Sequence, residues 1–297
     1  MEFALLGFSD IPNLQMFLFV MFLFIYVVTL MGNGIIILIT RADQTLQTPM
    51  YFFLSNFSFL EICYVSITLP RMLINIWTQK THISLFACAT QMSFVLMFGN
   101  IESLLLTVMA YECYVAICNP LHYPLIMNSK VCAQLVAACW VTGVPVEIGQ
   151  TCQIFSLPFS GSNQINHYFC DIPPMLNLAC GDTFLNEMLV ITGAVLFVMI
   201  PFLLILGSYS KITTTILKLP SATGRAKAFS TCSFPIMVVT LFFGSGIIIY
   251  LLPNSKNSSK TDKFLSLLYT ILTLMFNPLI YTLRNKDVLM ALRKLLT

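Results

Sequence analysis

The sequence predicts an all-α membrane protein, a seven-transmembrane helix bundle followed by a short amphipathic C-terminal helix. Of its 297 residues, 58% are hydrophobic and only 9% are charged, and the mean hydropathy is +0.86. A soluble domain carries about 25% charged residues. The chain therefore has too few polar side chains to cover a surface that faces water, and its apolar surface has to face lipid or a ligand.

Seven long apolar runs predict the membrane spans, because about 20 helical residues are needed to cross a hydrocarbon core of roughly 30 Å. They cover residues 16–39, 49–77, 85–117, 131–146, 188–210, 228–255 and 264–283. Backbone polar groups in lipid have to be paired within their own segment, so we interpret these runs as helices. None of them alternates polar and apolar residues as the strands of a membrane barrel do. Residues 16–283 are thus expected to form one helical domain.

The basic residues of the short connections predict the orientation in the membrane. One set of loops and the C-terminal segment hold ten of them: Arg41, Lys130, Lys211, Lys218, Arg225, Lys227, Arg284, Lys286, Arg293 and Lys294. The other set holds four: Lys80, Lys256, Lys260 and Lys263. The positive-inside rule then places the C-terminus in the cytoplasm. The N-terminal tail, residues 1–15, and a long loop over about residues 150–187 are expected outside.

The last residues, 284–297, predict the amphipathic helix. Apolar residues recur there at helical spacing, with Arg293 and Lys294 between them: Val288, Leu289, Leu292, Leu295 and Leu296. Such a helix lies on the membrane surface.

Several functional classes find no support in the sequence. The ten cysteines include no Cys-x-x-Cys pair and the three histidines lie far apart, which argues against a zinc site. We see no constellation of an enzyme and expect no nucleic-acid partner. A channel filter and the paired broken helices of a transporter are also not evident, so those two classes are the weaker alternatives.

Short motifs distributed over nearly the whole chain carry a resemblance to a known family. In chain order they are Leu6-Gly7-Phe8-Ser9, Gly32-Asn33, Thr48-Pro49-Met50-Tyr51-Phe52-Phe53-Leu54, Met109-Ala110-Tyr111-Glu112-Cys113-Tyr114-Val115-Ala116-Ile117-Cys118, Pro120-Leu121-His122-Tyr123, Ser208-Tyr209, Lys227-Ala228-Phe229-Ser230-Thr231-Cys232 and Asn277-Pro278-Leu279-Ile280-Tyr281. The set resembles the odorant (olfactory) receptors, a family of rhodopsin-like G-protein-coupled receptors. The resemblance implies a plasma-membrane receptor that binds a small volatile or semi-volatile molecule and activates an olfactory, stimulatory heterotrimeric G protein.

By this resemblance the ligand cavity lies between the third, fifth, sixth and seventh spans, beneath the long outer loop. Its expected walls are mostly apolar: Val95, Leu96, Gly99, Asn100, Gly193, Phe197, Gly246, Ile247, Tyr250 and Thr270. Such a set suits a small, weakly polar odorant that is bound mainly by burial of its carbon skeleton. Val95 stands where amine receptors carry a carboxylate, which argues against a biogenic amine.

Two carboxylates, Glu61 and Glu102, fall near mid-membrane, where ionisable groups are costly and usually mark function. The resemblance places them where such receptors hold a sodium ion, between the second, third and seventh helices. Adjacent carboxylates either hold a cation or share a proton. A protonated pair that only links the two helices by hydrogen bonds is therefore the alternative. We expect no other cofactor.

The same resemblance implies a disulfide and a coupling switch, and the sequence itself contains a possible modification site. Cys88 at the start of the third span and Cys170 in the outer loop are expected to form the disulfide, which the oxidising exterior permits. Asn257 begins an N-glycosylation sequon in the last outer loop. The residues of the coupling switch are Glu112, Cys113, Tyr114, Tyr209, Lys227, Asn277, Pro278 and Tyr281.

One residue of that switch departs from the family. The family has an acid-Arg-Tyr triplet at the inner end of the third span, where this chain reads Glu112-Cys113-Tyr114. A thiol supplies neither a permanent cation nor the planar donor fork of an arginine. Weakened or lost coupling to the G protein is therefore the alternative function.

Overall fold

The computed structural model describes residues 2–7, 14–79, 81–159 and 163–218, and beyond them residues 236, 239–240, 242–244, 246–248, 250, 288 and 290–292. Its elements in chain order are β1 (Glu2–Leu5), α1 (Gln15–Ala42), η2 (Gln44–Leu46), α2 (Pro49–Thr78), β2 (His82–Ser84), α3 (Leu85–Cys118), α4 (Tyr123–Ile126), α5 (Ser129–Phe155), β3 (Gln164–Ile165), α6 (Ile172–Leu178), α7 (Phe184–Ala194), the π-helical turn η3 (Val195–Met199) and α8 (Ile200–Leu217). The span predicted at 264–283 lies outside the described residues.

Within the described residues, five helical segments are long and apolar enough to cross a bilayer: α1, α2, α3, α5 and the continuous run Phe184–Leu217. They coincide with the first five predicted spans. Large apolar side chains such as Phe17, Phe24, Val141 and Leu203 are exposed on their outer faces. A water-soluble surface rarely carries so continuous an apolar covering. The membrane interpretation of the composition therefore agrees with the packing.

The fourth span is longer than predicted. The sequence suggested an end near Pro145 and Glu147, but α5 continues through Pro145 to Phe155. Proline removes one backbone hydrogen bond, whereas ending the helix in lipid would leave several backbone groups without partners. Glu147 is only 2% exposed, so its carboxyl group faces the protein and does not mark the membrane surface.

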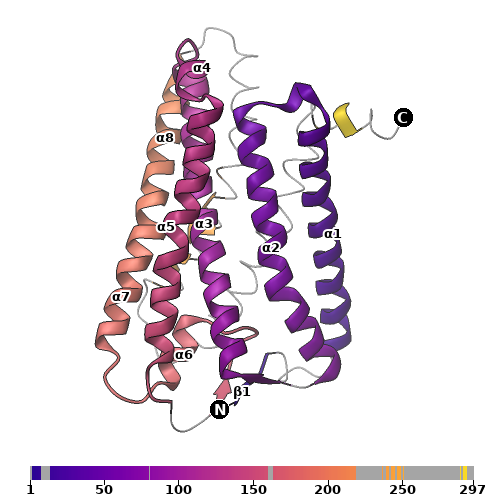
Figure 1. Cartoon of the computed structure of the whole chain (residues 1–297), viewed down its shortest axis with the longest axis vertical. Coiled ribbons are helices and arrows are strands. Elements are labelled where there is room, and N and C mark those ends of the chain that lie inside the picture. The colour runs from indigo at the N-terminus through magenta and orange to yellow at the C-terminus, as the bar shows by residue number, and fades with distance from the viewer. Residues whose placement is uncertain are drawn as a thin grey trace.

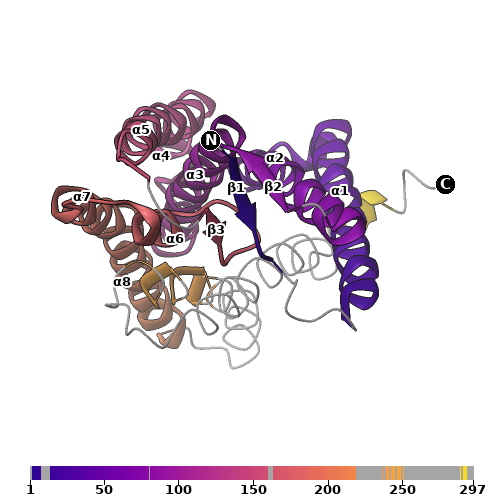
Figure 2. The same ribbon diagram turned by 90° about the horizontal axis from the view of Figure 1, so that it is seen from below.

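The long helices form a bundle in which α3 is central (Figure 1). It packs against α2, α5 and α8, while α1 packs along α2. Viewed along the bundle, α3 lies between α2 and α5, with α7 and α8 beside them (Figure 2). The largest apolar cluster follows this arrangement and includes Phe22, Phe57, Ile101, Leu105 and Ile212, all almost completely buried.

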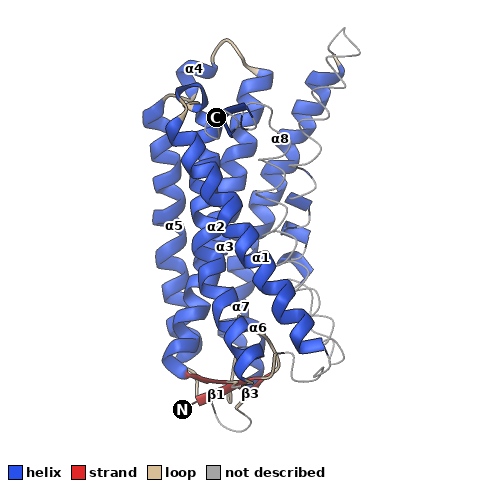
Figure 3. Ribbon diagram, turned by 90° about the vertical axis from the view of Figure 1, so that its right-hand side faces the viewer, coloured by secondary structure: helices blue, strands red, loops and turns tan. Residues whose placement is uncertain are grey.

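One end of the bundle carries a small sheet of three strands that the sequence did not predict (Figure 3). The strand order is β2-β1-β3; β1 is antiparallel to β2 and parallel to β3. Phe3 and Leu5 of β1 are each 1% exposed and join a second apolar cluster with Ile83 and Ile165. Because these strands come from three distant segments, no local periodicity in the sequence could reveal them.

The opposite end of the bundle holds η2, α4 and a third apolar cluster. Val288 and Ala291 are helical and almost fully buried there, against Ile36, Ile39 and Leu54 of α1 and α2. The C-terminal segment thus returns to the ends of the first two helices. The rest of the amphipathic helix predicted over 284–297, apart from residues 290 and 292, lies outside the described residues.

Candidate functional site

A cavity of about 70 Å³ lies inside the bundle near the end that carries the sheet. Its walls come from α2, α3, the loop before α6, η3 and the described residues around 242–250: Tyr64, Val95, Leu96, Gly99, Asn100, Ser103, Phe169, Asp171, Phe197, Val198, Phe242, Gly246 and Tyr250. Most of these groups are apolar, as in small-molecule sites generally. The volume has room for a few water-sized groups.

Of the ten predicted wall residues, seven line this cavity and two, Gly193 and Ile247, do not. Gly193 faces α5 instead, since a Cβ atom built on it would lie 3.8 Å from the Gln150 side chain. The π turn that follows inserts an extra residue and rotates the preceding turn away from the cavity. Ile247 lies about 100° around the helix from Gly246, and Gly246 and Tyr250 occupy the cavity-facing side. Thr270 lies outside the described residues.

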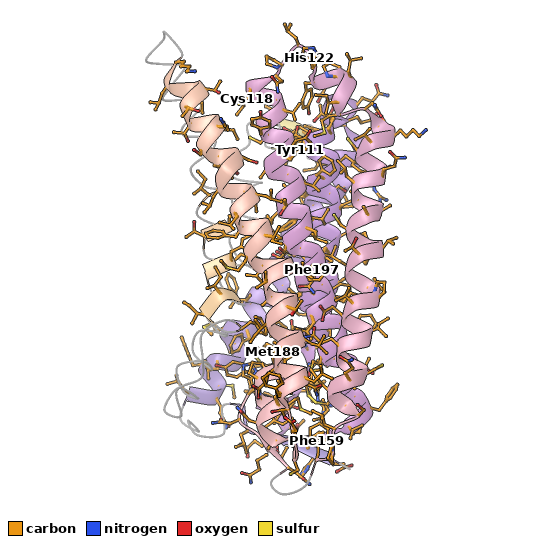
Figure 4. The ribbon with its side chains drawn as sticks, turned by 90° about the vertical axis from the view of Figure 1, so that its left-hand side faces the viewer. Tyr111, Cys118, His122, Phe159, Met188 and Phe197 are labelled. Carbon is orange, nitrogen blue, oxygen red and sulfur yellow. A yellow bond between two sulfur atoms is a disulfide. The ribbon has the colours of Figure 1, made fainter. Side chains whose placement is uncertain are left out.

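The π turn is fixed to α3 by a side-chain hydrogen bond. The Ser103 hydroxyl donates to the backbone carbonyl of Phe197 in the middle of η3. A π turn leaves carbonyl groups of the normal helical ladder without partners, and it often occurs at functional sites. Phe197, which is 5% exposed, therefore stays in the middle of the bundle (Figure 4).

The loop between α5 and α7 closes the cavity on the side of the sheet. The predicted disulfide between Cys88 and Cys170 is present, with the Cα atoms 5.5 Å apart, and both residues are fully buried. The backbone N–H of Cys170 also donates to Gln91 Oε1 of α3 at 3.3 Å. Two independent links thus hold this part of the loop against α3.

Asp171 directly follows the disulfide and forms part of the cavity wall. Its Oδ1 accepts hydrogen bonds from the backbone N–H of Ile172 at 2.8 Å and from the Tyr250 hydroxyl at 3.1 Å. Burial raises the pKa of Asp171 to about 6, although both hydrogen bonds act to lower it. This carboxylate therefore connects the loop between α5 and α7 with the helical residue Tyr250.

The sequence interpretation missed six wall residues: Tyr64, Ser103, Phe169, Asp171, Val198 and Phe242. Helical spacing could have found two of them. Ser103 lies one turn after Gly99, and Tyr64 lies one turn after Glu61, so each pair shares a helix face. Phe169 and Asp171 flank the disulfide cysteine, but only the folded loop shows that they point into the bundle.

Four further carboxylates are buried in the described helices: Glu61, Glu102, Glu147 and, at the far end of α3, Glu112. Glu61 is 1% exposed and Glu102 is 5% exposed, and their charges interact across α2 and α3. Glu147 on α5 accepts a hydrogen bond from the Asn100 Nδ2 atom of the cavity wall. No lysine, arginine or histidine lines the cavity within the described residues.

The end of α3 next to α4 holds the triplet Glu112-Cys113-Tyr114. Glu112 is 5% exposed, and its Oε1 accepts a hydrogen bond of 2.5 Å from the Tyr123 hydroxyl of α4. Burial raises the pKa of Tyr123, and the carboxyl group beside it acts in the same direction. Cys113 is half-buried and packs against the main apolar cluster.

Of the remaining predicted switch residues, two are among the described residues and four are not. Tyr209 is buried in the main cluster, 8% exposed, while Tyr114 is half-buried and stacks on Tyr111 with ring centroids 6.3 Å apart. Four switch residues and the glycosylation sequon lie outside the described residues: Lys227, Asn277, Pro278, Tyr281 and Asn257.

Comparison with known proteins identifies the family. The sequence model of the family described as "Olfactory receptor" matches residues 22–297. The chain belongs to the olfactory receptor family. The human olfactory receptor 10AG1 is 64% identical over 296 residues, covering 100% of this chain and 98% of the relative. Human olfactory receptor 10A5 is 53% identical over 294 residues, with 99% and 93% covered.

Membership in this family confirms several predictions at once. Olfactory receptors are G-protein-coupled receptors and not enzymes, so the expectation of a non-enzymatic receptor holds. They are multi-pass proteins of the plasma membrane, in agreement with the five apolar helices of the described residues. The cavity closed by the disulfide-linked loop is then the candidate odorant site.

Proposed function

We propose that this olfactory receptor binds a small, weakly polar odorant in the cavity and signals through an olfactory, stimulatory heterotrimeric G protein. The observation that carries the proposal is the cavity itself. Its walls come from α2, α3, η3 and the sixth span, and the outer loop is held over it by the disulfide. An odorant in this position contacts several helices at once, so it can favour one arrangement of the bundle over another.

The fold and orientation that this function requires are part of the proposal. Seven helices span the membrane, the N-terminus lies outside, and the C-terminal segment forms an amphipathic helix at the inner surface. The ten basic residues on one side support this orientation. Burial of Val288 and Ala291 against α1 and α2 supports the position of the last helix.

The direct test is a cyclic AMP assay with a panel of small odorants in cells that contain the olfactory G protein. At least one odorant should raise cyclic AMP, and Val95→Phe, which fills the cavity, should abolish that response while surface expression is retained. An epitope tag at each end tests the topology, because only the N-terminal tag should stain intact cells. Staining of both tags would exclude the proposed arrangement.

We also propose a sodium ion between α2 and α3. Sodium prefers hard oxygen ligands, as calcium and magnesium do. The buried Ser58 Oγ and Glu102 Oε1 have no hydrogen-bond partner among the described residues, and Glu61 lies one turn after Ser58. Buried oxygens that lack a hydrogen-bond partner can be stabilised by a bound cation or by protonation of the carboxyl group.

The sodium proposal is tested with Glu102→Gln, which keeps the shape of the side chain and removes its charge. Sodium should lower the odorant potency of the wild-type receptor and have a smaller effect on the variant. Equal sodium sensitivity in both would favour the protonated pair. Glu187→Gln, an exposed substitution on α7, is the matched control.

A further inference from the structure

We propose that the cavity selects odorants that donate a hydrogen bond, in particular aliphatic alcohols, over ketones and ethers of the same shape. This inference rests on the proposed function and specifies the ligand class of the same site. Three donors of the polar wall groups already have partners within the protein, and the strongest group left for a ligand is the carboxylate of Asp171, which can only accept.

Three of the wall donors have partners inside the receptor. The Ser103 hydroxyl donates to the Phe197 carbonyl, and the Tyr250 hydroxyl donates to Asp171. The Nδ2 atom of Asn100 donates to Glu147. A ketone or ether oxygen can only accept, so it is left with the Tyr64 hydroxyl and the second N–H of Asn100 and cannot bond to the carboxylate of Asp171.

Glu147 sets the direction of the Asn100 amide. Its carboxyl group is 2% exposed, and its Oε2 has no hydrogen-bond partner within the described residues. The bond from Asn100 to Oε1 therefore compensates a carboxyl group that is otherwise poorly solvated, and breaking it would be costly. With Nδ2 held toward α5, the Oδ1 atom of Asn100 is left to accept a hydrogen bond in the cavity.

Asp171 supplies the strongest acceptor of the wall. Both of its hydrogen bonds go to Oδ1, which leaves Oδ2 to accept a bond from a ligand. Hydrogen bonds to an ionised acceptor are roughly twice as strong as neutral ones. Asp171 and Asn100 both line the cavity, so a hydroxyl group bound there has two acceptors to choose from.

The remaining chemistry of the wall favours a neutral donor. The Tyr64 hydroxyl on α2 can donate and accept, as an alcohol can, so the two groups are compatible in either direction. An ionised acid would find no cationic side chain among the described wall residues. A protonated amine would also pair with the Asp171 carboxylate, but it would lose far more hydration than an alcohol on entering a mainly apolar cavity.

The test measures binding directly, by the thermal stability of the purified receptor in detergent with octanol, octanal, heptyl methyl ether or octylamine. Octanol should bind about tenfold more tightly than octanal and the ether, as expected for one hydrogen bond to a charged or buried acceptor. Equal or tighter binding of the aldehyde or ether would overturn the inference, and so would preferred binding of the amine. Absence of octanol binding would overturn it as well.

Variants identify the residues responsible. Glu147→Leu frees the Asn100 amide N–H and should shift the preference about tenfold toward octanal, whereas Glu147→Gln keeps a hydrogen-bonding partner and should shift it less. Glu187→Gln, exposed on α7, should leave the preference unchanged. An unchanged preference in Glu147→Leu would contradict the role given to Glu147. The comparison of ligands on the wild-type receptor decides the inference even if a variant does not fold.

The cyclic AMP assay with the same ligands separates this inference from the proposed function. If octanal or the ether signals as well as octanol, the donor preference is wrong and the receptor function stands. If octanol binds preferentially but no ligand raises cyclic AMP, the donor preference stands and the signalling proposal is wrong.

Discussion

At the scale of single residues, the end of α3 next to α4 lacks the arginine that the resemblance leads us to expect. Glu112 is bonded to Tyr123, and its neighbour Cys113 can offer no charge to the acid or to a G protein. The hydrogen bond satisfies one oxygen of a nearly buried carboxyl group. Tyr123 thus supplies a bond that holds α4 against α3, but it does not replace the missing cation.

We predict that Cys113→Arg raises the maximal cyclic AMP response to an activating odorant severalfold, because a guanidinium group supplies the cation and planar donor fork that a thiol lacks. Cys113→Lys, which has the charge without the fork, should have a smaller effect. Responses are compared at equal surface expression. Identical responses of the wild-type and arginine forms would remove this explanation and leave coupling independent of the residue.

The burial of Asp171 predicts how the stability of the folded receptor changes with pH. Its pKa in the folded receptor is about 6, above the ordinary value of 3.8, so the folded state disfavours the ionised form. Its contribution to stability is therefore greatest below about pH 4 and is lost as the pH rises through 6, by about 3 kcal/mol in total. The melting temperature of Asp171→Asn minus that of the wild type should increase across this window. A difference in melting temperature that does not change with pH would contradict the raised pKa of Asp171.

At the scale of elements, the π turn η3 shows how one extra residue can determine which face of a helix points toward the cavity. Its extra residue rotates α7 relative to α8, which turns Gly193 toward α5 and keeps Phe197 at the cavity. The Ser103 hydroxyl on α3 stabilises the turn through the Phe197 carbonyl. The helical run of α7, η3 and α8 therefore depends on α3 for the side that it presents to the cavity.

We predict that Ser103→Ala lowers odorant potency about fivefold, since one buried hydrogen bond of about 1 kcal/mol is lost and Phe197 is less firmly placed. Ser103→Thr retains the hydroxyl group and should keep most of the potency. Thr107→Val, one turn further along α3, removes only a bond to the α3 backbone and serves as the control. Equal potency of all three variants would refute a positioning role for Ser103.

At the scale of the whole molecule, the end of the bundle that carries the sheet is assembled from segments that are far apart in the sequence. The sheet brings β1, β2 and β3 together, and the disulfide joins the loop to the start of α3 across 82 residues. The apolar cluster around Phe3, Met92 and Met175 fills the space between them. Closure of the cavity is thus a property of the assembled end rather than of any one helix.

We predict that Cys170→Ser strongly reduces surface expression, because loss of a native disulfide typically costs about 2–5 kcal/mol and this one fixes the loop over the cavity. Cys152→Ser is the control, since Cys152 is exposed and takes no part in the disulfide. Surface labelling of intact cells measures both. Normal surface labelling of Cys170→Ser would show that the loop folds without the bond.

The sequence by itself determined the membrane class, the first five spans, the family and the Cys88–Cys170 pair, because hydropathy and short motifs are local properties of the chain. It also gave seven of the cavity residues through resemblance. Only the tertiary structure decided that α5 continues past Pro145, that a π turn rotates Gly193 away, and that Glu147 and Asp171 orient the polar groups of the cavity. These features depend on contacts between distant segments, where the partner of a buried polar group, and not its position in the sequence, fixes its role.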